Sequence, residues 1–294
     1  MDIPRTIVSI TPEWLTAALK SGGSLASGGV ISVQFDPPGD RKGFFAEVAT
    51  GVIKYSGDPG SAHGTIVAKV TIRMGELAKR FAREGVYENE ARIYADIGDD
   101  IGVPIPRLYY ADSDIETGLF VLLLEDLSGL RVVDETTGCS LKDALVVVRN
   151  AARLHARWWN SDRLNQLPWL LRPLEARWTG LRKAEYIANW NAGSRILKVH
   201  LSPEVYEIAE RLGPKYAEVM SGTPPFALTL NHDDYHLGNM FFGGGEVTTI
   251  DWQFANHGPP TLHGESRPQH EKYVRNQDIP IAVLYLHAPP ELMG

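Results

Sequence analysis

The sequence predicts a two-lobed α+β protein, in which an antiparallel five-stranded sheet with one main helix precedes a mainly helical lobe. Three observations predict this class. Segments rich in Val, Ile, Phe and Thr, separated by turn-like runs, dominate the first part of the chain. One segment of helical spacing interrupts them, and long segments of helical periodicity dominate the second part. The change follows Glu125 and Asp126, so we place the lobes at residues 1–126 and 127–294.

The N-terminal lobe is predicted to begin with a short helix. Thr11, Pro12 and Glu13 are typical of a helix cap, a first-turn proline and an acidic first turn, and this helix should end at Lys20. Three strands then form an antiparallel meander, and a helix over Glu76–Ile97 separates them from two more strands. The predicted strands are Val30–Phe35, Phe45–Tyr55, Thr65–Arg73, 104–112 and 118–126.

The C-terminal lobe is predicted to contain three long helices, because apolar residues recur there with a helical period. These helices are Leu141–Trp159, Pro173–Trp190 and Pro203–Met220. The last part of the chain, TLHGESRPQHEKYVRNQDIPIAVLYLHAPPELMG, contains four prolines, scattered charge and no sustained amphipathic period. It therefore predicts an irregular segment, and we interpret it as a truncated or frameshifted end.

The composition limits the possible partners and location. The chain has 294 residues, 44% of them hydrophobic, and a formal charge of −7, which argues against a nucleic acid or an anionic membrane as the main partner. Its longest apolar run, Leu119–Leu124, is far shorter than the ~20 residues of a membrane-spanning helix. The N-terminus does not read as a signal peptide, and the single Cys139 fits a reducing compartment. These features predict a cytoplasmic protein and leave its oligomeric state open.

One polar segment, HDDYHLGN, is typical of phosphoryl-transfer chemistry. Asp234 lies two residues after His232 and five before Asn239, which is the spacing of a kinase catalytic loop. Twelve residues later, Asp251 ends a β-branched run, where a second metal-binding aspartate is expected. Phosphoryl transfer needs a carboxylate that accepts the proton of the attacking hydroxyl, and an amide and a second carboxylate that hold Mg²⁺. The sequence therefore predicts a kinase-like site.

Such a site also needs a lysine on a strand and a glutamate on the following helix. Lys69 lies in the third predicted strand, and the helix offers Glu88 and Glu90. Glu90 shares a face with apolar residues that must point inward, whereas Glu88 stands four residues before Arg92, the spacing of an exposed ion pair. We therefore predict that Glu90 is the partner of Lys69.

The chain resembles the kinase-like phosphotransferases that include aminoglycoside phosphotransferases and choline kinases, and within them the ecdysteroid kinase-like (CHK kinase-like) group. The resemblance covers roughly residues 10–260, and it rests on motifs in a fixed order: IVAKV, YENEARIY, LLLEDL, ARLHARWW, HDDYHLGN and IDWQ. It implies a protein-kinase-like two-lobed fold and an enzyme that uses ATP and Mg²⁺ to phosphorylate a hydroxyl group of a small molecule.

The resemblance also implies roles for individual residues. Asp234 would be the catalytic base, with Asn239 beside it in the catalytic loop, and Asn239 and Asp251 would bind the metal. Lys69, paired with Glu90, would contact the nucleotide phosphates. The remaining candidate nucleotide contacts are Glu125, Asp126 and Leu127 on the adenine side, and Gly43 and Phe44 in GDRKGFF, a segment without the G-x-G-x-x-G form of a phosphate-covering loop.

Two other classes of function remain open. In one, His232, Asp234 and His236 are ligands of a hydrolytic metal, although all three histidines of the motifs, His155 included, also fit a structural role. In the other, the chain is a non-catalytic relative that binds a nucleotide or small ligand without transfer, as the unusual C-terminal segment suggests.

The sequence does not identify the phosphate acceptor. Candidate acidic residues Asp233, Glu175 and Glu185 would suit a cationic acceptor, and Asp233 replaces a glycine that is common in the family loop. Tryptophans in the helical lobe would equally suit a lipophilic alcohol, although large aromatic residues on helices more often belong to the core.

Overall fold

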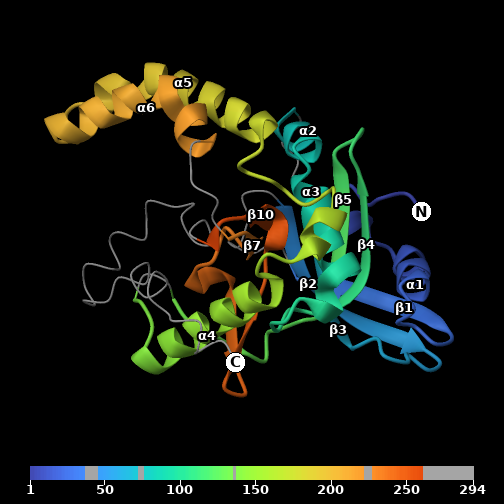
Figure 1. Ribbon diagram of the computed structural model, residues 1–294. Helices are drawn as coiled ribbons and strands as arrows, with labels where there is room; N and C mark the ends of the chain where they lie inside the picture. The colour runs from blue at the N-terminus through green and yellow to red at the C-terminus, as the bar shows by residue number, and fades with distance from the viewer. Residues whose placement is uncertain (37–45, 72–75, 135–136, 222–226, 261–294) are drawn as a thin grey trace.

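The first lobe is built on the predicted antiparallel five-stranded sheet. The computed structural model describes residues 1–36, 46–71, 76–134, 137–221 and 227–260. The sheet has the strand order β1-β2-β3-β5-β4, and all its neighbouring pairs are antiparallel (Figure 1). Its strands are β1 (Gly29–Phe35), β2 (Ala46–Ser56), β3 (Thr65–Thr71), β4 (Leu108–Asp114) and β5 (Leu119–Leu124).

The sheet separates two hydrophobic cores, as the buried strand β5 shows. Successive side chains of a strand point to opposite faces, so Phe120 and Leu122 join one cluster of buried residues and Val121 and Leu123 join the other. The helix α1 (Pro12–Ser21) covers the second face with its buried leucines. Its cap is the predicted one, because the Thr11 side chain accepts a hydrogen bond from the Trp14 N–H at 3.2 Å.

The long helix predicted over Glu76–Ile97 is wrong, because the structure breaks this segment. It forms α2 (Glu76–Arg83), α3 (Val86–Arg92) and a π-helical turn, η2 (Ile93–Ile97). The break falls at Gly85, whose φ of +79° lies in the left-handed region that glycine adopts without steric cost. The apolar period continues across this glycine, which explains why periodicity alone did not reveal it. The helix α3 packs on the first face of the sheet.

The second lobe contains the three predicted helices and several short strands. The helices are α4 (Leu141–Trp158), α5 (Ala176–Leu197) and α6 (Pro203–Ser221). Helix α5 begins later and ends later than predicted, because Glu175 is its cap and nothing in NAGSRIL stops it. The short strands form two small antiparallel sheets, β6-β8-β9 and β10-β7, which were not predicted. They are β6 (Arg131–Val132), β7 (Thr229–Asn231), β8 (Met240–Gly243), β9 (Glu246–Thr249) and β10 (Asn256–Gly258).

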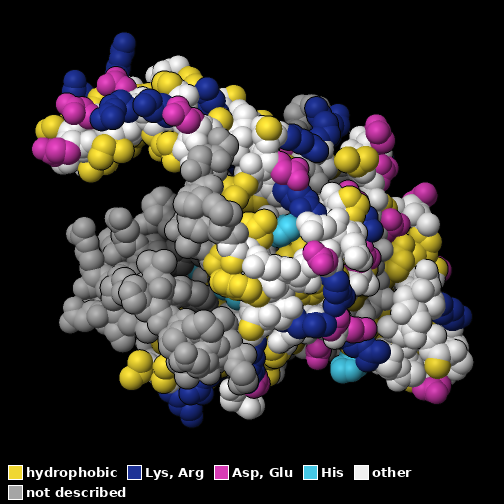
Figure 2. All heavy atoms as spheres, in the orientation of Figure 1, with side chains coloured by type: hydrophobic (Ala, Val, Ile, Leu, Met, Phe, Trp, Pro, Cys, Tyr) yellow, Lys and Arg dark blue, Asp and Glu magenta, His cyan; other side chains and the backbone are white. Residues whose placement is uncertain are grey.

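Helices α5 and α6 form a hairpin that projects from the rest of the molecule (Figure 1). Hydrophobic side chains are exposed along it, and Figure 2 shows several of them on one side of this arm. They are Ile196, Leu197, Val199, Val205, Ile208 and Val219. In the residues that the structure describes, no helix combines the length and the apolar character needed to cross a bilayer. The unusual C-terminal segment after residue 260 and the loop with Gly43 and Phe44 lie outside the described residues.

Candidate active site

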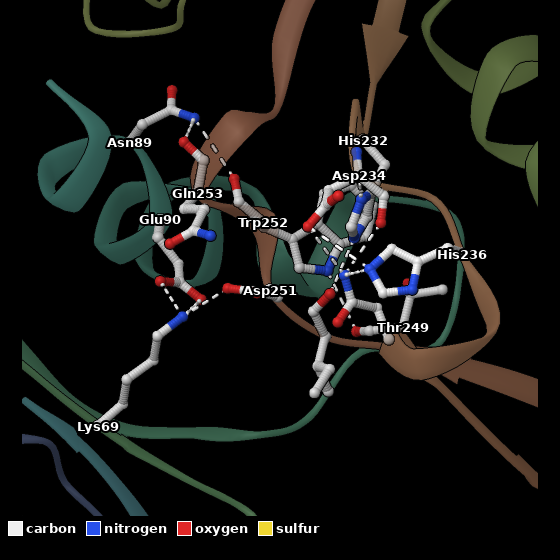
Figure 3. Close-up of polar contacts among 12 residues, drawn as sticks. Lys69, Asn89, Glu90, His232, Asp234, His236, Thr249, Asp251, Trp252 and Gln253 are labelled. Carbon is white, nitrogen blue, oxygen red and sulfur yellow. Dashed lines mark hydrogen bonds and ion pairs between the residues drawn. The ribbon is translucent and has the colours of Figure 1, made fainter. Parts of the chain in front are cut away.

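Three charged side chains from distant parts of the chain meet at one point. Lys69 comes from β3, Glu90 from α3, and Asp251 from the turn after β9. The Lys69 amine donates hydrogen bonds to both Glu90 oxygens, at 2.9 and 2.7 Å, and to Asp251 Oδ1 at 2.6 Å. Figure 3 shows both carboxylates converging on the amine. The predicted pairing of Lys69 with Glu90 is therefore present, and Asp251 joins it.

The burial of this charge cluster alters its titration. The Glu90 side chain is 1% exposed and that of Lys69 is 11% exposed. Burial by itself lowers the pKa of Lys69, but the charges of Asp251 and Glu90 outweigh it, so the pKa is raised and the amine stays protonated. Burial raises the pKa of Glu90, against the opposing effect of Lys69.

The neighbouring glutamate of the same helix has the predicted surface role. Glu88 Oε1 accepts a hydrogen bond from Arg92 at 3.3 Å, and both side chains are about four-tenths exposed. The apolar residues that share the face of Glu90 are all buried: Val86, Tyr87, Tyr94 and Ile97. Helical geometry thus separates the two glutamates as expected, with one inside the site and one in solvent.

The residues of the predicted catalytic loop form a separate, compact cluster. Asp234 is 3% exposed, and its backbone oxygen and Oδ2 accept hydrogen bonds from the Asn239 amide at 3.0 and 3.2 Å. The same amide lies 3.2 Å from His236 Nε2. Asp233, immediately before Asp234, has a φ of +61°, which turns the loop sharply. The structure therefore brings the predicted base and the predicted asparagine into direct contact.

The histidines of the motifs have structural roles. His232 is fully buried; its Nε2 lies 2.9 Å from the Ile250 oxygen, and its Nδ1 accepts a hydrogen bond from the Asp234 N–H. Burial lowers the pKa of both His232 and His155 to about 4, so both are neutral at physiological pH. Among the described residues, no group of three His, Cys, Asp or Glu side chains is arranged to hold a metal ion. The hydrolytic-metal alternative, with His232, Asp234 and His236 as ligands, thus lacks its ligand geometry.

The predicted adenine-side residues follow β5 directly. The Glu125 N–H donates to the Arg107 oxygen and Glu125 Oε2 accepts from the Arg107 N–H, so its backbone and side chain extend the pairing with the chain before β4. The Asp126 carboxylate accepts from the Ser128 N–H and hydroxyl. Leu127 is 9% exposed. The side chains of Glu125 and Asp126 are therefore engaged in local hydrogen bonds along the connection that follows β5.

The candidate acidic residues of the helical lobe are not gathered around the catalytic loop. Glu185 forms ion pairs with Arg80 and Arg182. Glu175 lies 3.5 Å from Arg172, at the edge of a cavity of about 550 Å³ behind α3, which Trp169 and Trp178 also line. Of the other tryptophans, Trp158 is a core residue with 1% exposure. The structure therefore does not show Glu175 and Glu185 together lining an acidic pocket for the phosphate acceptor.

Sequence reasoning missed one buried polar residue beside the charge cluster. Asn89 is fully buried, and its amide donates to backbone oxygens of the turn that follows Asp251. The sequence does indicate that Asn89 is buried, because it lies three residues after Val86 and four before Ile93, on the inward face of α3. A polar side chain in such a position requires internal partners.

The sequence profile of the phosphotransferase enzyme family, APH, matches residues 66–262, which is more than half of the chain. The chain belongs to this family. The matched region includes all five central residues of the site: Lys69, Glu90, Asp234, Asn239 and Asp251. No curated protein sequence matches the chain significantly.

Solved structures include proteins that are similar to this chain. A protein described as a putative aminoglycoside phosphotransferase from Ralstonia eutropha JMP134 is 19% identical, with a TM-score of 0.51 over 85% of this chain and 66% of its own. The chain thus spans less than two thirds of that protein. The macrolide 2'-phosphotransferase MphH from Brachybacterium faecium is 19% identical over 95% of this chain and 85% of its own, with a TM-score of 0.46. The predicted two-lobed, kinase-like fold is confirmed by the architecture and by the first of these similarities.

Proposed function

We propose that the protein is a small-molecule kinase, which uses ATP and Mg²⁺ to phosphorylate a hydroxyl group. Membership of the phosphotransferase enzyme family supports the reaction class. The observation that carries the proposal is the Lys69, Glu90 and Asp251 cluster, because a lysine bridging a helix glutamate and a metal-binding aspartate is what the nucleotide phosphates of a kinase require. We assign the nucleotide to residues 1–126 and the catalytic loop and metal to residues 127–294.

The residues present fit a magnesium ion. Asp251 Oδ1 faces Lys69, and within the described part of the chain no group makes a hydrogen bond to its other oxygen, Oδ2. Asn239 uses its amide nitrogen toward Asp234, and no described residue donates to its Oδ1. Carboxylate and amide oxygens are the donors that Mg²⁺ prefers. When bound, the ion would neutralise charge on the phosphates, and Asn239 and Asp251 would hold it.

The proposed chemistry places Asp234 as the proton acceptor. Its carboxylate would orient the hydroxyl of the acceptor and take its proton as the oxygen attacks the terminal phosphorus of ATP, with ADP as the leaving group. The Asn239 amide holds this carboxylate in place through Oδ2, while neutral His232 fixes the loop by its bond to the Ile250 oxygen. Lys69 would bind the phosphates, and Glu90 would orient Lys69.

The adenine would lie against the connection between the lobes. Because the Glu125 N–H is already paired with Arg107, we assign recognition of the base to the backbone at Asp126 and Leu127 and to the apolar contact of Leu127. Within the family, we assign the chain to the ecdysteroid kinase-like group because of the whole ordered set of motifs from IVAKV to IDWQ. The acceptor is a small molecule bearing a hydroxyl group.

The test is calorimetric titration of Mg·ATP into the purified, folded protein and into its Asp251→Ala variant. We expect binding by the first protein and little or none by the second. If binding is seen, a screen of hydroxyl acceptors follows, with Asp234→Asn as the inactive control. If the folded protein binds no Mg·ATP, the proposal fails, and the chain is then the non-catalytic relative. Binding without transfer to any acceptor would leave a nucleotide-binding protein.

A further inference from the structure

A single buried amide connects α3 to the turn that carries the metal-binding aspartate. The Asn89 side chain has no exposed surface, and its Nδ2 lies 2.8 Å from the Ala255 oxygen and 3.1 Å from the Gln253 oxygen. Its Nδ2 also lies 3.4 Å from the Trp252 oxygen. These carbonyls belong to the 3₁₀ turn η6 (Trp252–Phe254) and the residue after it, directly beyond Asp251 (Figure 3).

The contacts of Asn89 and Glu90 close a ring. Glu90, the next residue of α3, binds Lys69, and Lys69 binds Asp251. Asp251 leads into the turn whose oxygens Asn89 holds, so the path returns to α3 within one residue of its start. The backbone of Asp251 has a φ of +68°, which a non-glycine residue rarely adopts and which the surroundings must enforce.

We propose that Asn89 is a positioning residue, which holds the turn after Asp251 against α3 and so sets the Asp251 carboxylate for the metal. The consequence for nucleotide binding rests on the proposed function, whereas the positioning of the turn does not. Only a donor fulfils this role, because all three partners are carbonyl oxygens. A carboxylate of the same shape would repel them, and a leucine of similar volume would leave them without a donor.

The oxygen of the Asn89 side-chain amide also takes part in a hydrogen bond. Asn89 Oδ1 accepts a hydrogen bond from the Leu171 N–H at 3.4 Å, and the Leu171 oxygen accepts one from the His257 N–H at 2.9 Å. Asn89 therefore contacts the segment before α5 as well as the turn after Asp251. A side chain that only fills space would make neither set of directed contacts.

The first test needs no nucleotide. Hydrogen exchange is measured in the wild type, in Asn89→Leu and Asn89→Asp, and in Glu88→Gln as a surface control on the same helix. In both Asn89 variants we expect exchange at residues 251–255, where the Ala255 N–H bonds the Trp252 oxygen, to be about tenfold faster or more, since the buried hydrogen bonds from Asn89 to these carbonyl oxygens are lost. The rate of hydrogen exchange in strand β7 should be the same as in the wild type. Wild-type exchange at 251–255 in Asn89→Leu, or faster exchange spread evenly over the chain, would overturn the proposal.

The second test separates positioning from general damage. The affinity for ATP is measured with and without Mg²⁺, because Asp251 would reach the nucleotide only through the metal. In Asn89→Leu we expect the gain in affinity caused by Mg²⁺ to fall by about tenfold or more, with metal-free binding unchanged. In a protein that already carries Asp251→Ala, Asn89→Leu should cause no further change in the effect of Mg²⁺ on ATP affinity. If Asn89→Leu lowered the affinity for ATP equally with and without Mg²⁺, the positioning role would be refuted. A wild type that binds no ATP would refute the proposed function, while the exchange test still decides on Asn89.

Discussion

The two halves of the candidate site are held together by different forces. The charge cluster of Lys69, Glu90 and Asp251 joins residues 21 and 182 positions apart, through ion pairs of 2.6 to 2.9 Å. The predicted catalytic loop is held mostly by hydrogen bonds between residues two to five positions apart, such as those of Asn239 to Asp234, together with the contact of His232 to the Ile250 oxygen 18 positions away. The first arrangement exists only when the sheet, α3 and β9 are assembled, whereas the second depends mainly on contacts within its own short segment.

This difference indicates where substitutions should act. A change in the charge cluster leaves a buried ion without its partner, and should therefore affect folding as well as binding. A change in the catalytic loop that keeps its shape should leave folding intact and affect the reaction alone. Four substitutions test this division, and they are arranged by the size of their expected effect.

Asp234→Asn should have the largest effect, and on the reaction only. The amide has the shape of the carboxylate and can still accept the bond from Asn239, but it is a poor proton acceptor. We expect the turnover number for transfer to a hydroxyl acceptor to fall by about 10²- to 10⁴-fold, with the affinity for Mg·ATP and the melting temperature nearly unchanged. Steady-state kinetics with calorimetry measures this. Turnover close to the wild-type value would remove Asp234 from the role of base.

Lys69→Met should affect stability most. It leaves Glu90 and Asp251 close together without their common counter-ion, in a site where the lysine side chain is only 11% exposed. We expect a loss of about 3–5 kcal/mol in the free energy of unfolding, measured by urea denaturation. Lys54→Met, on the exposed side of neighbouring β2, is the matched control and should change it by less than about 0.5 kcal/mol. Equal effects of the two substitutions would show that the cluster does not contribute to folding.

A buried histidine outside both halves, His155 of α4, should make the stability of the protein depend on pH. His155, 3% exposed, lies beneath β7, and its backbone oxygen accepts a bond from Thr229. Burial lowers its pKa from 6.5 to about 4, so between these values the unfolded chain binds a proton that the folded chain does not. Stability is therefore complete above pH 6.5 and falls with decreasing pH, by about 1.4 kcal/mol per unit for this histidine. Urea titrations from pH 4.5 to 7.5 should show a slope smaller by that amount in His155→Gln. An unchanged slope would mean that His155 titrates normally in the folded protein.

The difference between local and long-range contacts also explains how much of the site could be predicted from the sequence. The spacing of His232, Asp234 and Asn239 encodes contacts within a few residues, so the motif contained the geometry. Glu90 was distinguishable from Glu88 because helical period separates an inward from an outward face. Asp251 was assigned to the metal alone, and its direct bond to Lys69 depends on how the sheet and β9 are assembled.

Other features depended on tertiary contacts or on single backbone angles. The chain breaks between α2 and α3 at Gly85, which has a positive φ. The apolar pattern around this glycine does not indicate that angle. The partners of the Asn89 Nδ2 are backbone oxygens 163 to 166 residues away, and backbone atoms leave no signal in the sequence. The small strands β6 to β10 have only two to four residues each, too short for a period to show.

The projecting hairpin should be the part of the molecule least connected to the site, and Ile208→Glu tests this. Ile208 is 62% exposed on α6, so its replacement removes little burial and places a charge in solvent. We expect the free energy of unfolding to change by less than about 0.5 kcal/mol, with Mg·ATP affinity and turnover unaffected. Leu154→Ala, in the core of α4 at 1% exposure, provides the contrast and should cost about 2–5 kcal/mol. A loss at Ile208 close to that at Leu154 would mean that the hairpin surface is covered in the protein in solution, and the division between a supporting core and an independent arm would have to be redrawn.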